Sequence, residues 1–467
     1  MKRAAALTLV CCALAPSLVA QENQLEAEFR MEGMSFGSSC VHPMGSFFGA
    51  IVGCGQVLLT GKPLHIAVGS LAPQNGVGTG LALTTHYTPN ENWRLFFDLD
   101  AVASSNLSWR AGGYMTAVLI RHPKIVVLSG PASANKTRGP VIQEMPAFHL
   151  YSQSISLNKL TYFGLGQGTS ATGRTYYGMR QTIVGANAVF PVFAPLNLSL
   201  FAEANGRFVA LRGSNIQANP SIETLYNEAT APGLVNQPAY AQFGQGIRLQ
   251  PSFANGYVRL NYSLGFEEWV AGTSGYSFQR FTADLSHQFP LYRNTRSLNP
   301  QEFNGPDSCL QSPTANSCPA ITRNLEGSFG FQFLYTASLI PGGNAVPFYF
   351  DPTLGGSDIN GTTLLGSYQD YRFRGPNLML LRGSFEHSIF KLPLGVKFMV
   401  DEGRVGLTPG QLGFDHLAHS FAAGLTLRAG GLPLVDLLFA WGGHEGNHTI
   451  ASISNALLGG GSRPSLY

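Results

Sequence analysis

Two short strings in the sequence match patterns that carry hydrolytic chemistry. Residues 444–448 read His-Glu-Gly-Asn-His, which has the HExxH spacing of zinc proteases. In those enzymes a helix places both histidines on one face to bind zinc, and the glutamate activates a water bound to the metal. Here the centre of the string is Gly-Asn, which favours a hairpin turn and disfavours a helix. We therefore expect a turn between two strands, and no zinc site.

The second string, Gly-Met-Ser-Phe-Gly at residues 33–37, has the GxSxG spacing of a nucleophilic serine. That serine needs a core strand before it and a helix after it, whereas only a short leader precedes this string. His416 and His419 begin a predicted strand and lack Cys, Asp or Glu partners at ligand spacing. We interpret them as residues at a loop end. The sequence thus predicts no enzyme, no metal site and no cofactor.

The composition indicates what kind of scaffold holds these residues. Only 12% of the 467 residues are charged, about half the share in soluble domains, so neither disorder nor an ordinary soluble surface is expected. No apolar run reaches the length of about 18 residues that a transmembrane helix needs. The formal net charge of +3 gives no indication of a nucleic-acid partner. Glycine (55 residues) and aromatic residues (11%) are both abundant, as strands with one face in lipid would require.

Many segments of about ten residues alternate apolar and polar side chains. In 258–267, for example, Val, Leu, Tyr, Leu and Phe occupy every second position. Successive side chains of a strand point to opposite faces of its sheet, so each segment has one apolar and one polar face. A soluble antiparallel sandwich also alternates, but these segments are longer than soluble strands usually are, and their polar faces carry few charges. In lipid, such strands must close into a barrel so that every backbone group is hydrogen-bonded.

The aromatic residues near strand ends fit the girdle of a membrane barrel. We expect such a girdle from Trp93, Phe96, Phe97, Tyr257, Trp269, Phe289 and Tyr292.

Fifteen strands can be placed along the chain, and because bacterial barrels normally have an even number, we expect about sixteen. The fold class is therefore an all-β, antiparallel transmembrane β-barrel. Short turns, such as those at 90–92 and 430–431, are expected on the periplasmic side, and the long connections are expected to face outward or fold into the lumen. The placed strands are 76–87, 93–104, 108–121, 147–157, 175–189, 196–210, 240–250, 256–268, 277–289, 327–340, 376–388, 393–405, 416–428, 432–442 and 447–455, and the long connections are 122–146, 211–239, 290–326 and 341–375.

The N-terminal region reads as an export signal followed by a leader. Residues 1–20 combine two basic residues, a short apolar run and a plausible cleavage site, as a signal peptide does. Residues 21–62 form a periplasmic leader without a helical period, and 63–467 form the barrel. An exported chain meets oxidising conditions, so Cys40–Cys54 and Cys309–Cys318 are possible disulfides. Four cysteines allow three pairings, and this one rests on proximity in the sequence.

Seven short strings follow one another along residues 65–455. They are Tyr-Phe-Gly-Leu-Gly at 162–166, Arg-Thr-Tyr-Tyr at 174–177, Ala-Thr-Ala-Pro-Gly-Leu at 229–234, Pro-Phe-Tyr-Phe at 347–350, Leu-Gly-Gly-Ser at 354–357, Tyr-Arg-Phe-Arg-Gly at 371–375 and Val-Asp-Glu-Gly-Arg-Val at 400–405. In their residues and their order these strings resemble the barrel of the bacterial surface antigen family, within the BamA/TamA superfamily.

The resemblance implies a long loop over 341–375 that folds back into the barrel, and two departures from the family pattern matter. Family members carry an Arg-Gly-Phe tip whose arginine meets a wall aspartate; residues 363–368 keep Gly366 and lack that arginine. By alternation, Asp401 points to the lumen, and Arg372 or Arg374 are candidates to replace the missing partner. Residues 21–62 are also too few for a periplasmic POTRA domain. The candidate lumen and loop residues are Gly355, Gly356, Gly366, Arg372, Arg374, Asp401 and Gly403.

The function that the resemblance implies is assembly or translocation of other proteins at the bacterial outer membrane. A weak seam between the first and last strands, 76–87 and 447–455, would act as an edge that an incoming strand can join. The expected partners are outer-membrane lipid and client outer-membrane proteins, with the chain itself a monomer. A passive, porin-like channel for small solutes is the alternative, and a surface barrel plugged by 341–375 is a third possibility.

Overall fold

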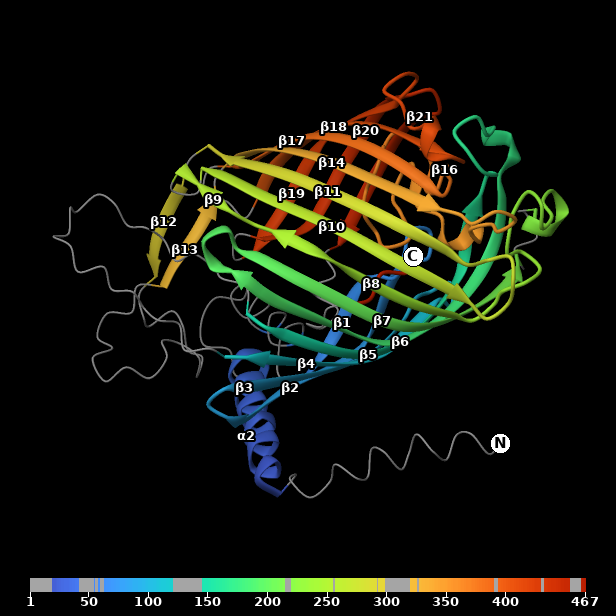
Figure 1. The fold of residues 1–467 in the computed structure, drawn as a ribbon. Helices are drawn as coiled ribbons and strands as arrows, with labels where there is room; N and C mark the ends of the chain where they lie inside the picture. Colours follow the sequence, from blue (N-terminus) through green and yellow to red (C-terminus); the bar gives the residue numbers. More distant parts are fainter. Residues whose placement is uncertain are drawn as a thin grey trace, which may run out of the picture.

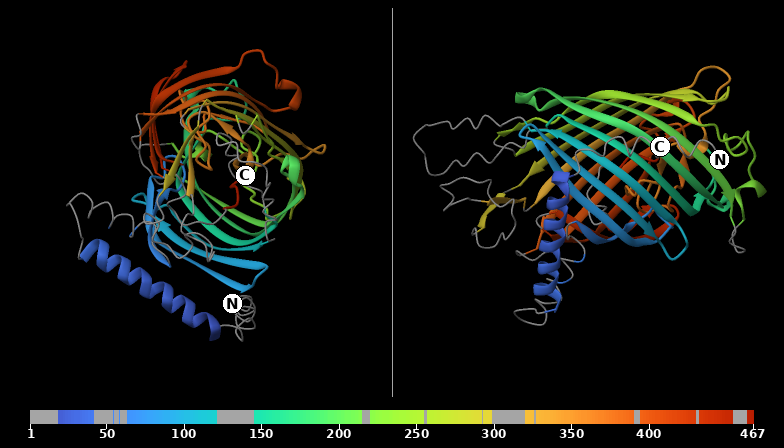
Figure 2. Two further views of the ribbon diagram at one scale, coloured as in Figure 1. Left: turned by 90° about the vertical axis from the view of Figure 1, so that its left-hand side faces the viewer. Right: turned by 90° about the horizontal axis from the view of Figure 1, so that it is seen from below.

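The fold is known from a computed structural model, and one large antiparallel sheet dominates it (Figure 1). The structure describes residues 19–41, 54, 58, 63–120, 145–214, 220–254, 257–291, 293–298, 320–325, 327–389, 394–429, 432–453 and 463–467. Figure 2 shows that the sheet curls round on itself, so that its strands form a ring around a central lumen. This confirms the expected all-β, antiparallel barrel architecture.

Within the described residues the sheet has 17 strands, and apart from β9 each pairs with the next strand of this sheet along the chain. One of them, β9 (Ser252–Phe253), is a two-residue piece. It pairs with the first two residues of β10, beyond the end of β8 along the same edge. The remaining sixteen form the wall, as the even-number rule predicts. They are β1 (Leu64–Ser70), β2 (Val77–Asn90), β3 (Trp93–Ala103), β4 (Trp109–Leu119), β5 (Ala147–Tyr162), β6 (Thr175–Phe193), β7 (Leu198–Gly213), β8 (Tyr240–Leu249), β10 (Val258–Ala271), β11 (Phe278–Pro290), β14 (Ser328–Leu339), β17 (Asn377–Ser388), β18 (Leu394–Gly406), β19 (Ala418–Ala429), β20 (Leu432–Gly443) and β21 (Gly446–Ile453).

All fifteen predicted strands are present, and the strand that was not predicted is β1. It has seven residues with only Leu64, Ile66 and Val68 on its apolar face, which is too little alternation to stand out from the glycine-rich segment before it. Its register with β2 runs from the pair Leu64–Leu83 to the pair Ser70–Val77. The first strand of the barrel is therefore β1, and the predicted first strand at 76–87 is the second.

The two ends of the barrel differ in their connections. We call the end with the turn at residues 91–92 the turn end and the opposite end, with the connection 163–174, the loop end. Two of the long connections, 122–146 and 290–326, begin at the same end as the short turn, although the sequence led us to expect long connections to face outward or fold into the lumen. Leu119 pairs with Trp93, and Pro290 pairs with Ser328, so β4 and β11 both finish at the turn end. Strand parity, and not loop length, decides the end at which a connection lies.

The wall is apolar on its outer face and polar on its inner face, the opposite of a soluble protein. Apolar side chains on its outer face are exposed, among them Leu99, Phe331, Phe398 and Phe439, each at 47% or more. Polar side chains on the inner face are buried, such as Gln153, Gln181, Asn205, Arg207 and Gln242. Strand alternation therefore places hydrocarbon outside and hydrogen-bonding groups inside, the reverse of a soluble sandwich.

Among the expected girdle residues, Tyr292 lies outside the described residues and Trp269 does not lie at the outer surface. Trp93 is 38% exposed, but Trp269 is fully buried. Its ring stacks on Phe278 with centroids 5.3 Å apart, and the guanidinium of Arg207 lies 4.8 Å from its centroid. Trp269 follows the alternating pattern at the loop end of β10 and is in phase with Glu267 on the inner face, so it belongs to the lumen and not to the girdle.

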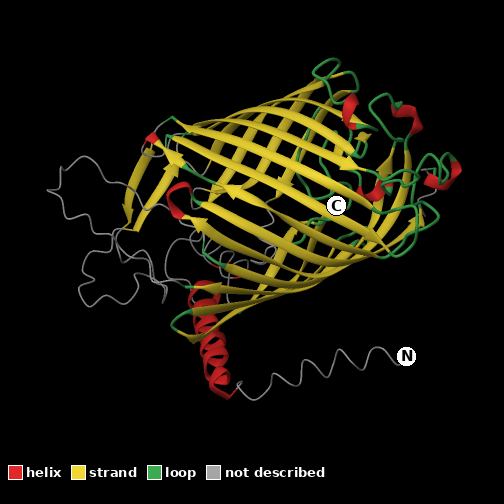
Figure 3. Cartoon of the chain, viewed as in Figure 1, coloured by secondary structure: helices red, strands yellow, loops and turns green. Residues whose placement is uncertain are grey.

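Residues 21–62, expected to have no helical period, contain most of α2 (Val19–Phe36), which begins inside the predicted signal peptide, and a short π-helix (Gly37–Val41). Figure 3 shows α2 projecting from the barrel wall. Gln, Glu, Leu, Ala, Arg and Met favour a helix by intrinsic propensity, although they are not arranged as an apolar stripe. Glu28 accepts a hydrogen bond from the hydroxyl of Thr85 (3.0 Å), and Glu32 accepts one from the backbone N–H of Leu64 (3.2 Å). Within the described residues, no helix is both long and apolar enough to cross a membrane.

Candidate functional site

The connection between β14 and β17, residues 341–375, fills part of the lumen, and we call it the inward loop. It contains the short helix η8 (Phe348–Phe350) and the two-stranded piece β15 (Thr353–Leu354) with β16 (Phe373–Arg374). Every residue from 346 to 359 is buried. Wall strands that are far apart around the ring contact it, including β5, β6, β10, β18 and β20. The loop therefore spans the lumen, as the resemblance implied.

Aromatic packing anchors the first part of the inward loop. The ring of Phe348 lies 4.9 Å from that of Tyr162 and 5.1 Å from that of Tyr177, measured between centroids. The ring of Phe350 lies 4.6 Å from that of Trp269. Each such pair adds about 0.5–1.5 kcal/mol beyond the burial of apolar area. These contacts fix η8 between β5, β6 and β10.

Two arginines, one on the wall and one on the inward loop, bind the backbone of η8. Arg280 donates to the carbonyl of Phe350 (2.8 Å), and Arg374 donates to the carbonyl of Phe348 (2.6 Å). Asp351 follows directly, is 1% exposed, and neither carboxylate oxygen has a hydrogen-bond partner within the described residues. Burial raises the pKa of Asp351 to about 8, although the positive charges of Arg280 and Arg374 act in the opposite direction.

The wall aspartate predicted to face the lumen does so, and it binds the inward loop directly. Asp401 is 2% exposed and accepts a hydrogen bond from the backbone N–H of Leu365 (3.0 Å). Its arginine partner is Arg382, whose Nε and Nη2 lie 2.7 and 2.9 Å from the two carboxylate oxygens. Arg382 also donates to the carbonyl of Thr363. The pair is a wall ion pair, set by the β17–β18 register, that clamps the loop backbone from both sides.

Neither Arg372 nor Arg374 pairs with Asp401, so the prediction that one of them replaces the missing arginine is wrong. Arg374 is occupied with the carbonyl of Phe348, and Arg372 forms a salt bridge with Glu445 and donates to the hydroxyl of Thr169 (2.8 Å). Glu445 lies in the tight turn between β20 and β21. Its role as the partner of Arg372 was not foreseen, because a salt bridge between residues 73 positions apart leaves no local signal in the sequence.

The candidate glycines lie in or against the inward loop. Gly355 and Gly356 have φ angles of +104° and +60°, a region that side chains disfavour. Gly366 packs against the last strands: a Cβ atom there would lie 2.6 Å from Cδ1 of Ile450 on β21. Gly403, on β18, faces Leu354 of the loop, and a Cβ atom there would approach its Cδ1 to 2.9 Å.

The first and last wall strands form a seam. Cα atoms of β1 and β21 approach within 8 Å of each other, but among the described residues no ladder pairing joins the two strands. With seven and eight residues they are the shortest of the sixteen wall strands in the described part. Since the predicted first strand was the second, the seam lies at 64–70 and 446–453 and not at 76–87. Gly366 places the inward loop next to this seam.

The strings with enzyme-like spacing do not form active sites. Residues 444–445 are the turn between β20 and β21, as expected, and His448 lies on β21. Residues 33–37 are the end of α2 and the start of the π-helix, so the strand-turn-helix context of a nucleophilic serine is absent there. Among the described residues, no cluster of three or more His, Cys, Asp or Glu side chains is arranged to hold a metal.

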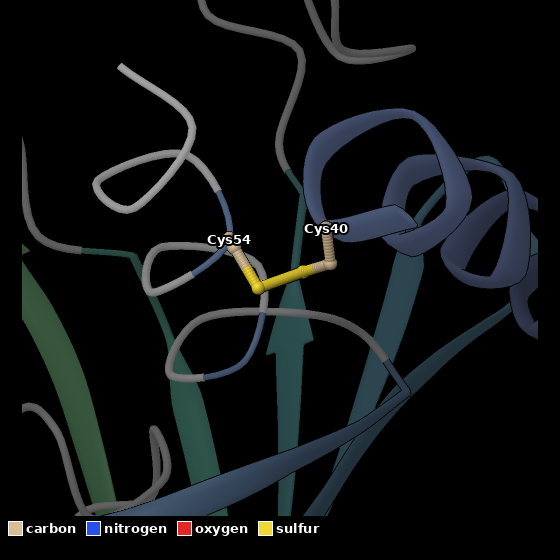
Figure 4. The surroundings of a disulfide bond; sticks show 2 residues. All are labelled: Cys40 and Cys54. Carbon is tan, nitrogen blue, oxygen red and sulfur yellow. A yellow bond between two sulfur atoms is a disulfide. The ribbon is translucent and has the colours of Figure 1, made fainter. Parts of the chain in front are cut away.

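One of the two expected disulfides lies within the described residues. Cys40 and Cys54 are bonded, with Cα atoms 4.7 Å apart (Figure 4). The bond ties the end of the π-helix to the segment before β1. Cys309 and Cys318 lie outside the described residues.

Comparisons with solved structures give matches of low sequence identity. CdiB from Acinetobacter baumannii matches with a TM-score of 0.45 and 11% identity over 84% of this chain and 60% of that one. CdiB from Escherichia coli matches with 0.45 and 12% over 81% and 58%. BamA from Haemophilus ducreyi lacking POTRA domains 1–3 matches with 0.44 and 10% over 84% and 69%. The chain thus spans about three fifths of either CdiB. No family model and no curated protein matches it.

Proposed function

We propose that this chain is a β-barrel of the bacterial outer membrane. The exposed apolar outer face and the polar inner face of the wall support this location, because a strand barrel satisfies its backbone hydrogen bonds internally and suits a lipid surround. Residues 1–20 would direct export, and 21–62 would form a periplasmic leader. The turn end would then face the periplasm, since α2 and the Cys40–Cys54 bond precede β1 there. Lipid is the expected partner, nucleic acid is not, and the barrel is proposed to be a monomer.

Within that membrane we propose that the barrel handles other protein chains at its seam, in assembly or translocation. The observation that carries this proposal is the β1–β21 contact without ladder pairing among the described residues. A strand edge whose N–H and C=O groups are unpaired is a template for an incoming strand. The motif resemblance implies the same role. The Asp401–Arg382 clamp supports it too, because it holds the inward loop where Gly366 contacts β21.

The seam can be tested by photocrosslinking in living cells. A photoreactive benzoylphenylalanine is placed at Ile66 of β1 or at Ile450 of β21, and crosslinked products are identified by mass spectrometry. Phe331 on β14 is the matched control, since it is apolar, 58% exposed and far from the seam around the sheet. We expect crosslinks to unfinished outer-membrane proteins from the seam positions and none from Phe331.

The alternative is a passive channel for small solutes, which the polar lumen wall favours. It predicts that the purified barrel conducts ions in planar bilayers without any partner and that the seam positions crosslink no more than Phe331 does. That pair of results would overturn the proposed role in handling protein chains.

A further inference from the structure

The last residues of the sequence lie inside the barrel. Figure 2 shows the C-terminus within the ring of strands. Arg463 donates to Asp100 on β3 (2.7 Å), and its guanidinium lies 5.8 Å from the ring centroid of Tyr114 on β4. Arg207 on β7 donates to the carbonyl of Ser465 (2.9 Å). Residues 463–467, which we call the plug segment, are therefore bound to the wall at two separate places.

The opposite side of the plug segment is bound by the inward loop. The side chain of Asn360 donates to the hydroxyl of Ser465 (3.2 Å) and accepts from the backbone N–H of Leu466 (2.9 Å). The hydroxyl of Tyr467 donates to the carboxylate of Asp358. Leu466 is 5% exposed and belongs to the main apolar cluster of the lumen. One short peptide thus receives polar contacts at both of its ends and an apolar contact between them.

The groups that bind the plug segment are themselves buried and charged. Arg207 is 1% exposed, Asp358 is 4% and Asp100 is 6%. Burying a charge is costly unless hydrogen bonds compensate for it, and the plug segment supplies part of that compensation to all three. Asp100 also pairs with Arg110 on the wall (2.9 Å), so Arg463 is not the sole positive charge beside this carboxylate.

The plug segment also closes off space in the lumen. A cavity of about 390 Å³ lies between β7, β8, β10, β11, β14 and the inward loop, and Ser465 and Tyr467 form part of its lining. Movement of these two residues would join this cavity to the space that the segment now occupies. The segment therefore forms part of the boundary of this cavity.

We propose that the lumen contains a peptide-binding site, occupied by the chain's own residues 463–467, and that departure of this segment opens the lumen. The site suits an extended peptide with a basic residue and, four positions later, a tyrosine that directly follows a leucine. The basic end binds Asp100, and the phenol binds Asp358. This inference is independent of the function proposed for the seam, because it concerns passage through the lumen.

A disulfide lock tests the closed state. Asn360→Cys and Ser465→Cys place thiols where the present side chains are in hydrogen-bond contact. In planar bilayers we expect the oxidised double variant to show no openings, and the reductant to restore them. Reductant on the native chain is the control for the Cys40–Cys54 bond.

Weakening the site tests the open state. The pair Arg463→Gln and Tyr467→Phe removes one charge and one hydroxyl without removing the segment. We expect the ratio of open to closed time to rise about tenfold to a hundredfold, as the loss of one or two hydrogen bonds to charged groups implies. Arg404→Gln is the matched control, because Arg404 pairs with Asp415 in an exposed loop. A synthetic peptide with the sequence of residues 463–467, added to the weakened variant, should restore closure.

Heat-modified gel migration shows that each variant is folded before recording. If folded locked and weakened variants conduct as the native chain does, or if the synthetic peptide leaves the weakened variant open, the segment is a static part of the lumen and the proposal is wrong.

Discussion

Asp401 forms an ion pair with Arg382 on the wall and also accepts a hydrogen bond from the backbone of the inward loop. We predict that Asp401→Asn destabilises the barrel by about 3–5 kcal/mol, the usual cost of breaking a buried ion pair. It should also release the inward loop. Urea unfolding in lipid vesicles measures the first effect, and protease cleavage within 355–370 measures the second.

The matched control is Asp436→Asn, which breaks the Lys397–Asp436 pair between strands and leaves the loop untouched. Protease resistance of the loop in Asp401→Asn equal to that in Asp436→Asn would contradict the clamp.

The raised pKa of Asp351 leads us to predict that the stability of the barrel depends on pH. Its pKa is raised by burial to about 8, so the folded chain binds a proton that the unfolded chain has already lost above the ordinary aspartate pKa of about 4. The stabilising contribution is therefore present at low pH and is lost as the pH rises from about 4 to 8. Urea midpoints from pH 5 to pH 9 should fall for the native barrel and fall less for Asp351→Asn. Asp415→Asn, at an exposed position, should behave as the native chain does, and equal slopes in all three would refute the assignment.

Single residues could be predicted from the sequence only where strand alternation decides their face. Alternation placed Asp401 in the lumen correctly. It could not identify Arg382 or Glu445 as partners, because those pairings depend on the register of neighbouring strands and on the path of a loop. Alternation also places Trp269 on the inner face of β10, and the girdle prediction is wrong there because an aromatic residue near a strand end is not always interfacial. In the structure its ring packs against Phe350 of η8.

At the scale of elements, the contact between the inward loop and the last strands rests on the absence of a side chain at Gly366. We predict that Gly366→Val forces apart the loop and β21, because a Cβ atom would lie 2.6 Å from Ile450 and 3.2 Å from Ala440. Overpacking of this kind costs about 1–3 kcal/mol. Gly383→Val on β17 is the control, since no atom lies within 4 Å of its Cβ position. The urea midpoint should fall for the first variant only, and an equal change in both would show that the loop does not press on the seam.

The strands themselves were predictable because each has its own alternating pattern, and ends were correct within a few residues. The exceptions were elements without such a pattern. β1 is too short to show a period, and α2 has helical propensity without an apolar face. The seam was consequently predicted one strand away from its actual position.

At the scale of the whole molecule, the architecture follows from alternation and strand count, but the relation between the two ends does not follow from loop length. Each strand carries the chain from one end of the barrel to the other, so the number of preceding strands decides the end at which a connection lies. The length of a connection therefore does not predict its end. The segments that fill the lumen are held by contacts between residues far apart in the sequence. The inward loop was therefore predicted only from the resemblance to a family, and the plug segment was found only in the structure.

The central claim is that the outer face of the wall meets hydrocarbon and the inner face does not. Single cysteines at Phe329, Gly330, Phe331 and Gln332 of β14, labelled with a fluorophore in lipid vesicles, test it directly. Nitroxide groups on the lipid tails should quench labels at 329 and 331 strongly and labels at 330 and 332 weakly. Equal quenching along the strand, or quenching in the opposite phase, would contradict the claim.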